Sequence, residues 1–563
     1  MRHLPAIRLL CTVPPKLKNL SYRYRSRALS EARRAVTEYL HSTRALPFAL
    51  ADHIASNSPF SLSVLVSQIP FHDPSPLHIP RTLRRFLSYH PINEFDFFFE
   101  SIGLPRASYP SPSCRLLFLS DDEPLLAAVN SLVRFGFPWT RLGILYREAA
   151  CIFNESSELL VKRLRTVEAL GLRRICVIGI CLAFPSVLTA DCDPGGEIDL
   201  LLRDLKKVFV DFGMDDCAGD DVDVFFEICC RIRVFYHAGS VKGTMGEIMG
   251  RNQRVFLDLE ESFLAQRLDF FRKLGMHKEK VGTFVLDHVE ILDFDLENTK
   301  ISLREYLRKV GLSEEEVLRV SQECPFVMGR NKLSNLPGIM RATNLHEWFL
   351  DKIMNDNGRC ISPDFASNIG YDVKIDGEFI EDLERLKSVK MHEFLSIKLD
   401  FICSIGFGEN RITAKAVGLL NGTMNQLQER FDCLLELGIE YPMLCRIISA
   451  APKVLNQGKD NILQKVNYLC NDLNYSLEYL ENFPAFLCFD LENRIRPRYR
   501  ILNWLQEIGL LKKPFSPATV LANSEKRFII NLWSIHPAAP KQWLECFSSR
   551  GDTDGRPKNI FSA

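Results

Sequence analysis

Hydrophobic residues recur along the chain at spacings of three and four, which is the spacing of one face of a helix. Two such faces follow one another within residues 483–509: Leu487, Leu491 and Ile495, then Ile501, Leu505 and Ile508. Pro497 lies between the two sets and has no N–H for a helix interior, although it suits the first turn of a new helix. The pattern therefore predicts two helices that meet in a sharp corner at Pro497.

Many of the predicted helices end in an apolar residue followed by glycine, which adopts the left-handed conformation of a helix C-cap without strain. These glycines are Gly103, Gly136, Gly171, Gly213, Gly275, Gly311, Gly406, Gly438 and Gly509. Asn474 fills one gap, because asparagine also tolerates this conformation. From Gly406 onward the caps lie 32, 36 and 35 residues apart. A period near 34 is the length of a helical hairpin.

Proline repeats with the same period. Three prolines lie fourteen residues after their glycines, in the strings AFPSVL, ECPFVM and AAPKVL: Pro185, Pro325 and Pro452. The spacing predicts a unit of helix, glycine cap, second helix and a proline turn that leads into the next unit. Since one unit cannot bury its apolar face alone, we expect the units to stack. The predicted fold class is all-α, a helical-repeat solenoid with units of about 34 residues.

With 563 residues, 46% of them hydrophobic, the chain is too long for one ordinary domain and must be multidomain or a repeat array. Parts of it fit the repeat poorly. Residues 57–81 and 105–124 are rich in proline and predict loops, 191–223 is acidic and glycine-rich, and no clean cap lies between Gly311 and Gly406. We therefore expect N-terminal repeats with insertions over 35–325, irregular or degenerate repeats over 326–398, C-terminal repeats over 399–547 and a flexible tail over 548–563.

The formal net charge of the chain is zero, yet residues 1–30 hold no acid and seven cations: Arg2, Arg8, Lys16, Lys18, Arg23, Arg25 and Arg27. Such a start, with interspersed leucine and serine, predicts an organelle transit peptide, which we place at 1–34. A disordered basic arm is the alternative. The rest of the chain is about seven charges negative, which argues against nucleic-acid binding over the whole surface and favours local binding.

Apolar runs and cysteines exclude two further classes. The longest uncharged apolar run, Ile175–Leu188, has 14 residues and contains Pro185, so it is too short to span a bilayer and predicts a buried helix. The 17 cysteines include no CxxC pair. Scattered cysteines are typical of free thiols in a reducing compartment and not of a disulfide or zinc framework.

The unit with a leucine–glycine cap and a proline fourteen residues later resembles the repeat of the mitochondrial transcription termination factor family, mTERF. The string FPAFLCFDLENRIRPRYRIL is similar to the segment that closes the array in plant organellar members, and Pro484 follows Asn474 by only ten residues, as in the last unit of that family. The resemblance is specific from Leu399 to Leu511 and weaker from Ala35 to Pro325. It implies an all-α, nucleic-acid-binding protein of mitochondria or plastids, without catalysis.

No constellation of residues predicts an enzyme, a metal site or a cofactor. The carboxylates of residues 215–227 miss the alternating spacing of a calcium loop, which favours a solvated acidic loop. The 12 histidines include no HExxH, and neither a P-loop nor a GxSxG motif occurs. Scattered serines and aspartates do not make a catalytic triad without geometry.

Four arginines stand within seven residues beside the predicted corner: Arg494, Arg496, Arg498 and Arg500. We predict that they bind phosphate, with Tyr499 as a residue that could stack on a base. Further candidate cations for nucleic-acid binding are Lys453, Lys459, Lys512, Lys513, Lys526 and Arg527. Between Arg446 and Lys541, thirteen Lys or Arg stand against eight Asp or Glu. The alternative is structural: Arg494 pairs with Asp490, and the cations offset a helix dipole.

Two functions of different class follow. The first is a regulator of mitochondrial or plastid gene expression that binds organellar DNA or RNA with its C-terminal units and acts in transcription termination, its regulation or transcript processing; its location is the mitochondrial matrix or, alternatively, the plastid stroma. The second is a scaffold for other proteins without direct nucleic-acid binding. The acidic body and the aromatic string FDFFFE at residues 95–100, which we expect to be exposed, favour the scaffold.

Overall fold

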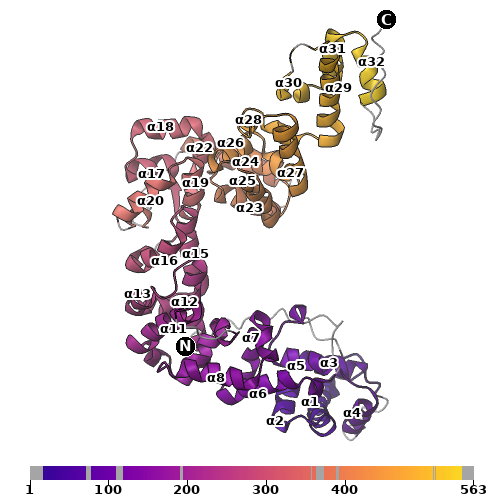
Figure 1. The fold of residues 1–563 in the computed structure, drawn as a ribbon, viewed down its shortest axis with the longest axis vertical. Helices are drawn as coiled ribbons and strands as arrows, with labels where there is room; N and C mark the ends of the chain where they lie inside the picture. Colours follow the sequence, from indigo (N-terminus) through magenta and orange to yellow (C-terminus); the bar gives the residue numbers. More distant parts are fainter. Residues whose placement is uncertain are drawn as a thin grey trace. The chain divides into compact units, whose positions relative to one another are not determined.

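The computed structural model describes residues 17–71, 78–109, 118–189, 195–293, 295–356, 358–362, 365, 373–388, 392–511, 513 and 515–547. The chain divides into two compact units, drawn in Figure 1 in colours from indigo to magenta and from magenta to yellow. Unit 1 comprises Met1–Leu268 and Lys278–Asp287, and unit 2 comprises Asp269–His277 and His288–Ala563.

Unit 1 is built from helices that are mostly shorter than four turns. Its α-helices are α1 (Tyr22–Glu38), α2 (Phe48–Ser56), α3 (Pro59–Gln68), α4 (His78–Tyr89), α5 (Glu94–Ser101), α6 (Glu123–Phe135), α7 (Leu142–Glu148), α8 (Ser157–Glu168), α9 (Arg174–Ala183), α10 (Ser186–Thr189), α11 (Glu197–Lys206), α12 (Val222–Ala238), α13 (Gly246–Arg251), α14 (Gln253–Asp258), α15 (Glu261–Lys273, whose end belongs to unit 2) and α16 (Lys278–Asp287).

Unit 2 continues the same architecture. Its α-helices are α17 (Leu303–Val310), α18 (Glu314–Glu323), α19 (Leu336–Ala342), α20 (His346–Asn355), α22 (Val373–Lys387), α23 (His392–Ser404), α24 (Arg411–Leu419), α25 (Met424–Glu436), α26 (Tyr441–Ala450), α27 (Lys459–Asn467), α28 (Tyr479–Asn482), α29 (Arg496–Glu507), α30 (Pro517–Ala522), α31 (Glu525–Ile535) and α32 (Ala539–Gln542). Within the described residues the strands are β1 (Lys300–Ser302) and β2 (Arg330–Lys332), an antiparallel pair. The predicted all-α class is confirmed.

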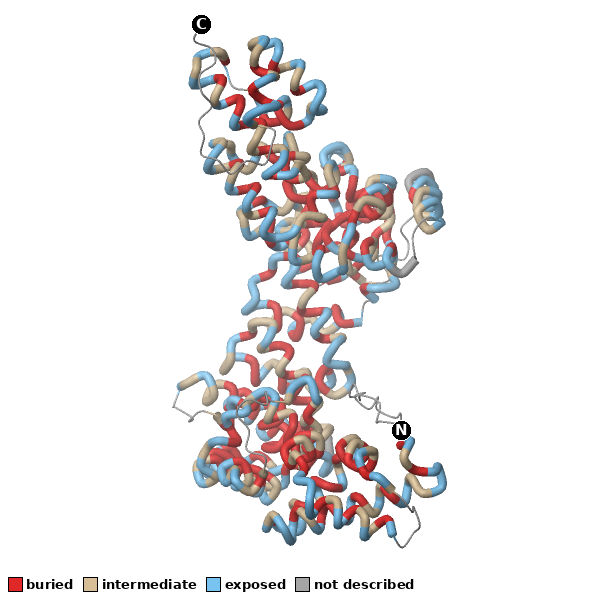
Figure 2. Tube along the Cα trace, turned by 90° about the vertical axis from the view of Figure 1, so that its right-hand side faces the viewer, coloured by how far each residue is buried: buried red, intermediate tan, exposed pale blue. Residues whose placement is uncertain are grey.

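The glycine caps have the predicted geometry. All nine glycines have positive φ, from +70° at Gly213 to +119° at Gly136, and Asn474 has φ of +55°. In each unit these caps turn the chain from one helix to the next, so that apolar faces meet inside the unit (Figure 2). Two caps escaped the sequence pattern. Gly239 ends α12 with φ of +112°, and Asn344 follows α19 with φ of +56°.

Asn344 lies 33 residues after Gly311. The interval from Gly311 to Gly406 thus holds a repeat whose cap is asparagine, as it is at Asn474. The signal was present in the sequence, because asparagine is the second residue, after glycine, that adopts the left-handed conformation at low cost.

The proline turns share one backbone conformation. The residue before each proline ends a helix with φ between −127° and −139° and ψ between 58° and 73°: Phe184, Cys324, Ala451 and Phe483. Proline disfavours the helical region in the residue that precedes it, so the second helix of each unit has to end there. A 3₁₀ turn then begins at Pro325, Pro452 and Pro484. His288, which no proline follows, has a similar bend with φ of −125° and ψ of 61°.

Two predictions about the N-terminal half are wrong. The string FDFFFE is not exposed: it forms most of α5, and Phe95, Phe97, Phe98 and Phe99 are at most 6% exposed. Residues 59–68, predicted as part of a loop, form α3, because Pro59 occupies the first turn of that helix, where a missing N–H costs nothing. The apolar run 175–188 is confirmed as buried helix in α9 and α10. Along the described residues no helix combines the length and the apolar character that crossing a bilayer requires.

The N-terminal helix α1 belongs to the core of unit 1. Its residues Ala28, Ala32 and Val36 are fully buried, and α1 packs against α2, α3 and α4. Asn19, just before α1, donates hydrogen bonds to the carbonyl oxygens of Val66 and Ile69 at 2.7 and 2.9 Å. The segment predicted as a transit peptide, 1–34, therefore overlaps a structural helix. Its first 16 residues and the tail 548–563 lie outside the described residues.

Candidate nucleic-acid interface

The four arginines lie on one nearly continuous helix, and the corner is not at Pro497. A π-helical turn over Leu491–Ile495 runs directly into α29, and Pro497 occupies the first turn of α29. The chain reverses earlier, at Phe489 and Asp490, which have extended backbones with ψ of 152° and 126°. The predicted helix over 487–495 is thus interrupted: Leu487 belongs to the preceding 3₁₀ turn, Pro484–Cys488.

Helical periodicity separates the arginines into two pairs. Arg494 and Arg498 are four residues apart and share one face, whereas Arg496 is about 200° around the helix axis from Arg494 and shares its face with Arg500. Alternate basic residues on a helix point in opposite directions. The structure therefore does not bring the four guanidinium groups to one surface.

Arg494 and Arg498 point inward, toward α30 and α31. Arg494 donates to the carbonyl oxygens of Leu521 at 2.6 Å and of Asn523 at 3.0 Å. The side chain of Arg498 is 2% exposed and donates to Val520 O and Asn523 O, both at 2.8 Å. These carbonyl groups lie at the end of α30, where a helix lacks internal donors, so both arginines cap it.

The inward pair also has counter-ions and aromatic partners. Arg498 forms an ion pair with Glu525 at 2.9 Å, and Trp543 donates its indole N–H to the other carboxylate oxygen of Glu525 at 2.6 Å. The guanidinium of Arg498 lies 4.5 Å from the ring centre of Phe528. Burial lowers the pKa of Arg494, and the positive charge of Arg498 lowers it further. Arg498 is therefore closed to an outside phosphate, and half-buried Arg494 already donates Nε and one terminal nitrogen to carbonyl groups of the chain.

Arg494 does not pair with Asp490, as the structural alternative supposed. Asp490 instead accepts a hydrogen bond from the backbone N–H of Asn493 at 2.7 Å, which holds the pKa of its carboxyl below the usual value.

The capping role of Arg494 repeats in earlier units. Arg163, Arg231 and Arg430 each lie eight residues before a cap glycine and each donates to a carbonyl oxygen 25 residues later. The acceptors are Leu188 O, Phe256 O and Leu455 O, at 2.5, 2.7 and 2.8 Å. Lys465, which lies nine residues before the cap Asn474, donates in a similar way to Leu487 O at 2.9 Å, and burial lowers its pKa. Arg267 and Lys398, also eight residues before a cap glycine, are buried as well.

This recurring cation was missed in the sequence. The signal was a basic residue at a fixed offset of eight before the glycine, within an otherwise apolar helix face. It shows that part of the positive charge of the chain is used to satisfy carbonyl groups at the end of a turn, and that a count of Lys and Arg overstates the charge available to a ligand.

Arg496 and Arg500 form the outward pair. Arg500 is exposed, and Arg496 is 39% exposed and pairs with Glu492 at 2.6 Å. The guanidinium of Arg496 lies 5.6 Å from the ring centre of Tyr468, on the helical turn that ends the preceding unit. Burial raises the pKa of Tyr468, as does Asp472, while Arg496 and Arg500 oppose the shift. Two cations and a half-buried aromatic ring thus meet on one surface.

Tyr499 does not face solvent. It is 6% exposed, its ring lies 6.4 Å from that of Tyr468 in an edge-on arrangement, and within the described residues its hydroxyl has no hydrogen-bond partner. Burial raises its pKa. The aromatic residue beside the accessible arginines is therefore Tyr468, which lies outside the arginine string of the sequence.

The other candidate cations are exposed but dispersed. Lys453 and Lys459 flank the proline turn of the preceding unit, and Lys459 lies 3.6 Å from Glu436. Lys526 and Arg527 are exposed in the first turn of α31, a helix that packs on the inward side of α29 through Phe528 and Arg498. Lys513 is exposed, and Lys512 lies outside the described residues.

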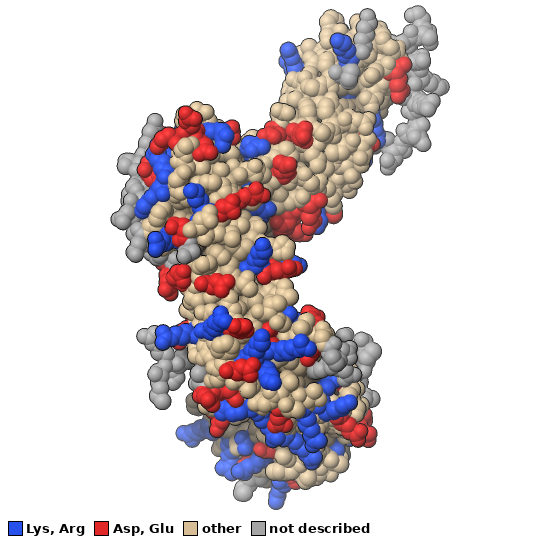
Figure 3. Space-filling view, turned by 60° about the vertical axis from the view of Figure 1, so that its left-hand side comes forward, with Lys and Arg blue, Asp and Glu red and all other residues tan. Residues whose placement is uncertain are grey.

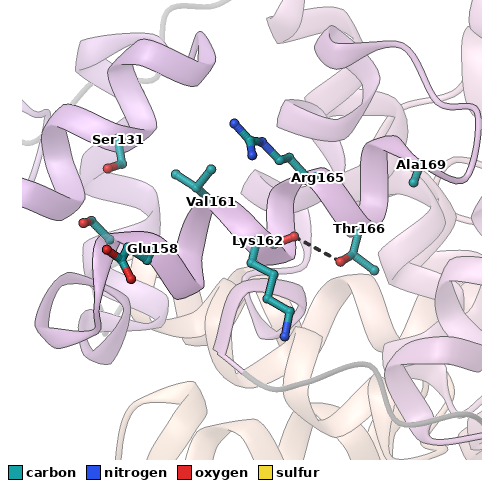
Figure 4. A pocket seen from close by; sticks show the side chains of 8 residues that line it. Ser131, Glu158, Val161, Lys162, Arg165, Thr166 and Ala169 are labelled. Carbon is teal, nitrogen blue, oxygen red and sulfur yellow. Dashed lines mark hydrogen bonds between the residues drawn. The ribbon is translucent and has the colours of Figure 1, made fainter.

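Across the described ranges no cluster of His, Cys, Asp and Glu has the arrangement of a metal site. A hollow of about 630 Å³ beside α8 is lined by Ser131, Glu158, Lys162 and Arg165 among others, and Lys162 and Arg165 leave α8 in different directions (Figure 4). These polar groups do not converge on a point. In the acidic stretch, Asp215 and Asp220 pair with Arg173, so this stretch is not simply solvated.

Comparison with known proteins adds an independent observation. The family model for mTERF matches residues 226–337 and 387–529. The chain is 40% identical over 545 residues to a protein of Arabidopsis thaliana named Transcription termination factor MTEF18, mitochondrial, with 96% of this chain and 97% of that protein covered. It is 26% identical over 262 residues to Transcription termination factor MTERF8, chloroplastic, of the same plant, with 46% and 47% covered. Transcription termination factor MTERF15, mitochondrial, also from that plant, is 20% identical over 297 residues, with 53% of each chain covered.

Proposed function

Because the chain belongs to the mTERF family, we propose that it is an organellar nucleic-acid-binding protein that regulates gene expression, through transcription termination or transcript processing. The names of the similar proteins are those of organellar termination factors, and none is the name of an enzyme. The relative that matches along nearly the whole chain is named as mitochondrial, which favours the mitochondrial matrix over the plastid stroma.

The observation that carries the proposal is the outward surface of Arg496, Arg500 and Tyr468. Guanidinium groups on one helix face offer forked donors to phosphate oxygens. Among the described residues the acid in contact with the pair is Glu492, whose side chain is 59% exposed. This exposed ion pair contributes little energy, so a phosphate can replace it. The exposed cations Lys453, Lys459, Lys513, Lys526 and Arg527, with Lys512, remain proposed secondary contacts; Arg494, Arg498 and Tyr499 act by holding the last unit together.

The scaffold alternative has lost one of its two observations. The aromatic string of residues 95–100 is part of the core of unit 1 and offers no surface to a protein partner. Contacts with other proteins of organelle gene expression are compatible with the proposal but are not what the exposed arginines predict.

The test is binding of the full chain to labelled duplex DNA and to single-stranded RNA over a series of salt concentrations. Each phosphate contact contributes a slope of about 0.9 on duplex DNA and about 0.7 on a single strand to the dependence of log affinity on log salt. We expect the variant Arg496→Gln with Arg500→Gln to bind more weakly and to flatten the slope by about 1 to 2 units.

The matched control removes two exposed cations from other helices of unit 2, by Arg319→Gln on α18 with Lys415→Gln on α24. It should change the slope less than the Arg496 and Arg500 variant does. A parent chain that binds neither nucleic acid contradicts the proposed function, and equal slopes for the parent and the Arg496 and Arg500 variant contradict the proposed site.

A further inference from the structure

The first helices of unit 1, within residues 17–90, carry an excess of positive charge that the candidate interface does not explain. On the face drawn in Figure 3, Lys and Arg side chains gather over this unit. Residues 17–90 contain ten Lys or Arg and four Asp or Glu, although the whole chain has 70 of each. This segment lies outside the residues that the mTERF model matches, 226–337 and 387–529. The family match therefore does not explain the charge of residues 17–90.

The exposed face of α4 combines cations with aromatic rings. Arg81, Arg85 and Tyr89 follow one another at intervals of four, so they form a row along the helix about 12 Å long. All three are exposed, and Tyr89 is 75% exposed. Within the described residues neither Arg81 nor Arg85 has an ion-pair partner. Arg84, on another face of α4, does pair, with Glu38 at 2.9 Å.

A hollow of about 450 Å³ adjoins this row. One wall is formed by Ile69 and Pro70 after α3, and the other by Arg85, Phe86, Tyr89 and His90. The rings of Phe86 and His90 stack in parallel, with centres 4.2 Å apart and planes 7° apart. The hollow thus has a flat aromatic wall beside an unpaired guanidinium group.

The neighbouring helix adds charge. α1 packs against α4, and its exposed residues Arg23, Arg27 and Arg34 lie on one face of α1 at offsets of four and seven. The apolar face of α1 is used in the core of the unit, since Ala28, Ala32 and Val36 are fully buried. The surface that remains is basic and not broadly apolar, which fits a phosphate-bearing polymer better than the interior of a membrane.

We propose that the face of α4 is a second binding site, for a single-stranded nucleic acid. Arg81 and Arg85 bind successive backbone phosphates, and Tyr89 with the Phe86–His90 stack supplies a platform for an unpaired base. A duplex keeps its bases stacked inside and cannot use such a platform, so the site selects single strands. The inference shares its ligand class with the proposed function but uses different residues in the other unit.

The experiment measures binding of the full chain to a short fluorescent oligouridylate, to a blunt-ended RNA duplex of equal length and to vesicles that contain phosphatidylglycerol. Tyr89→Ala should weaken oligouridylate binding about tenfold, Tyr89→Phe should retain it, and duplex binding should change little, because stacking requires an unpaired base and only a ring. Arg81→Gln with Arg85→Gln should flatten the salt slope for oligouridylate by about 1.4 units.

Arg84→Gln is the matched control, because it removes one charge from the same helix but not from the row. Thermal unfolding of every variant checks that α4 still folds. The same binding measurements on the Arg496→Gln, Arg500→Gln variant separate the two sites. If Tyr89→Ala weakens oligouridylate binding and the Arg496 and Arg500 variant does not, this inference is retained and the proposed interface is contradicted. Oligouridylate binding that is unchanged in the Tyr89 and Arg81/Arg85 variants overturns the inference. So does an equal loss in Arg84→Gln, or a loss confined to vesicle binding, which would assign the surface to lipid headgroups.

Discussion

Arg494 and Arg498 donate hydrogen bonds to the same backbone oxygen, that of Asn523, at 3.0 and 2.8 Å. Two guanidinium groups can share one carbonyl at the end of a short helix because Glu525 supplies a negative charge 2.9 Å from Arg498. The pair fastens α29 to α30 and α31. Two of the four clustered arginines, Arg494 and Arg498, thus stabilise the fold of the last helical repeat.

Replacement of Arg498 by glutamine should therefore destabilise the protein. The change removes bonds to two carbonyl groups and to Glu525, and a hydrogen bond to a charged group contributes about 1.5–3 kcal/mol net. We expect the free energy of unfolding to fall by about 2–3 kcal/mol, measured as a lower thermal midpoint. Arg500→Gln, on the exposed face, should leave the midpoint nearly unchanged. Similar midpoints for the two variants would contradict the division into inward and outward pairs.

The contrast between these arginines explains what the sequence could and could not predict. The caps at Gly438 and Asn474 were predictable, because a left-handed residue after an apolar run has few alternatives. The direction of Arg498 was not, because it depends on the position of α30, about twenty residues later in the chain. Tyr468 was missed for the same reason: its contact with Arg496 joins two neighbouring helical repeats and leaves no local pattern in the sequence.

The same limit applies to the buried phenylalanines of α5. A run such as FDFFFE is apolar on several faces of a helix, and the sequence does not say whether other elements cover it. In the structure Phe98 contacts Trp139 edge-on with ring centres 6.2 Å apart, and Phe99 lies 5.0 Å from Tyr146. Both partners lie some forty residues further along the chain.

Two cap glycines should respond differently to alanine. Gly438 and Gly406 have φ of +93° and +108°, so a side chain at either position adds about 1–2 kcal/mol of backbone strain. A Cβ at Gly438 would lie 3.7 Å from Leu477, an ordinary contact, whereas a Cβ at Gly406 would lie 2.5 Å from the carbonyl oxygen of Gly338. We expect Gly406→Ala to cost about 1–3 kcal/mol more than Gly438→Ala.

Denaturant unfolding measures the loss of free energy of unfolding in the two variants. Gly509→Ala serves as a reference, since no atom lies within 4 Å of a Cβ at that position. The backbone contact alone predicts that alanine destabilises most at Gly406 and less, to a similar degree, at Gly438 and Gly509. A larger effect at Gly438 than at Gly406 would show that the approach of Gly406 to α19 is not rigid. Gly438→Val should also destabilise, because a β-branched residue is disfavoured at positive φ.

The position of α1 predicts how much of the N-terminus is dispensable for folding. A chain that begins at Leu17 keeps the core residues Ala28, Ala32 and Val36, and it should unfold at the temperature of the full chain. A chain that begins at Ala35 loses most of α1 and should unfold at a clearly lower temperature, since it exposes the apolar surfaces of α2 and α4.

Import is tested separately with a fluorescent reporter. A fusion of residues 1–30 to the reporter should enter mitochondria, because the segment is rich in arginine and contains no acid. Reporter that stays in the cytosol would contradict the targeting role, and reporter in plastids would move the proposed location. Normal stability of the chain that begins at Ala35 would restore 1–34 as a removable segment.

The last prediction concerns the hydroxyl of Tyr499, which is buried and has no partner among the described residues. A buried hydroxyl without a hydrogen bond costs about 1–3 kcal/mol, so Tyr499→Phe should leave the stability at neutral pH unchanged or raise it. Burial raises the pKa of Tyr499 in the folded state, whereas a tyrosine in the unfolded chain titrates near about 10. Above that pH the unfolded state loses its proton first, and folding stability falls.

Phenylalanine has no such proton, so Tyr499→Phe should lose less stability than the parent as the pH rises above about 10. Chemical denaturation at neutral and alkaline pH measures the change. Tyr22→Phe is the control, because Tyr22 is 85% exposed and should not alter the alkaline limb. Equal alkaline losses in the parent and in Tyr499→Phe would mean that the hydroxyl reaches solvent in the native state, and Tyr499 would then return to the residues available to a nucleic-acid base beside Arg496 and Arg500.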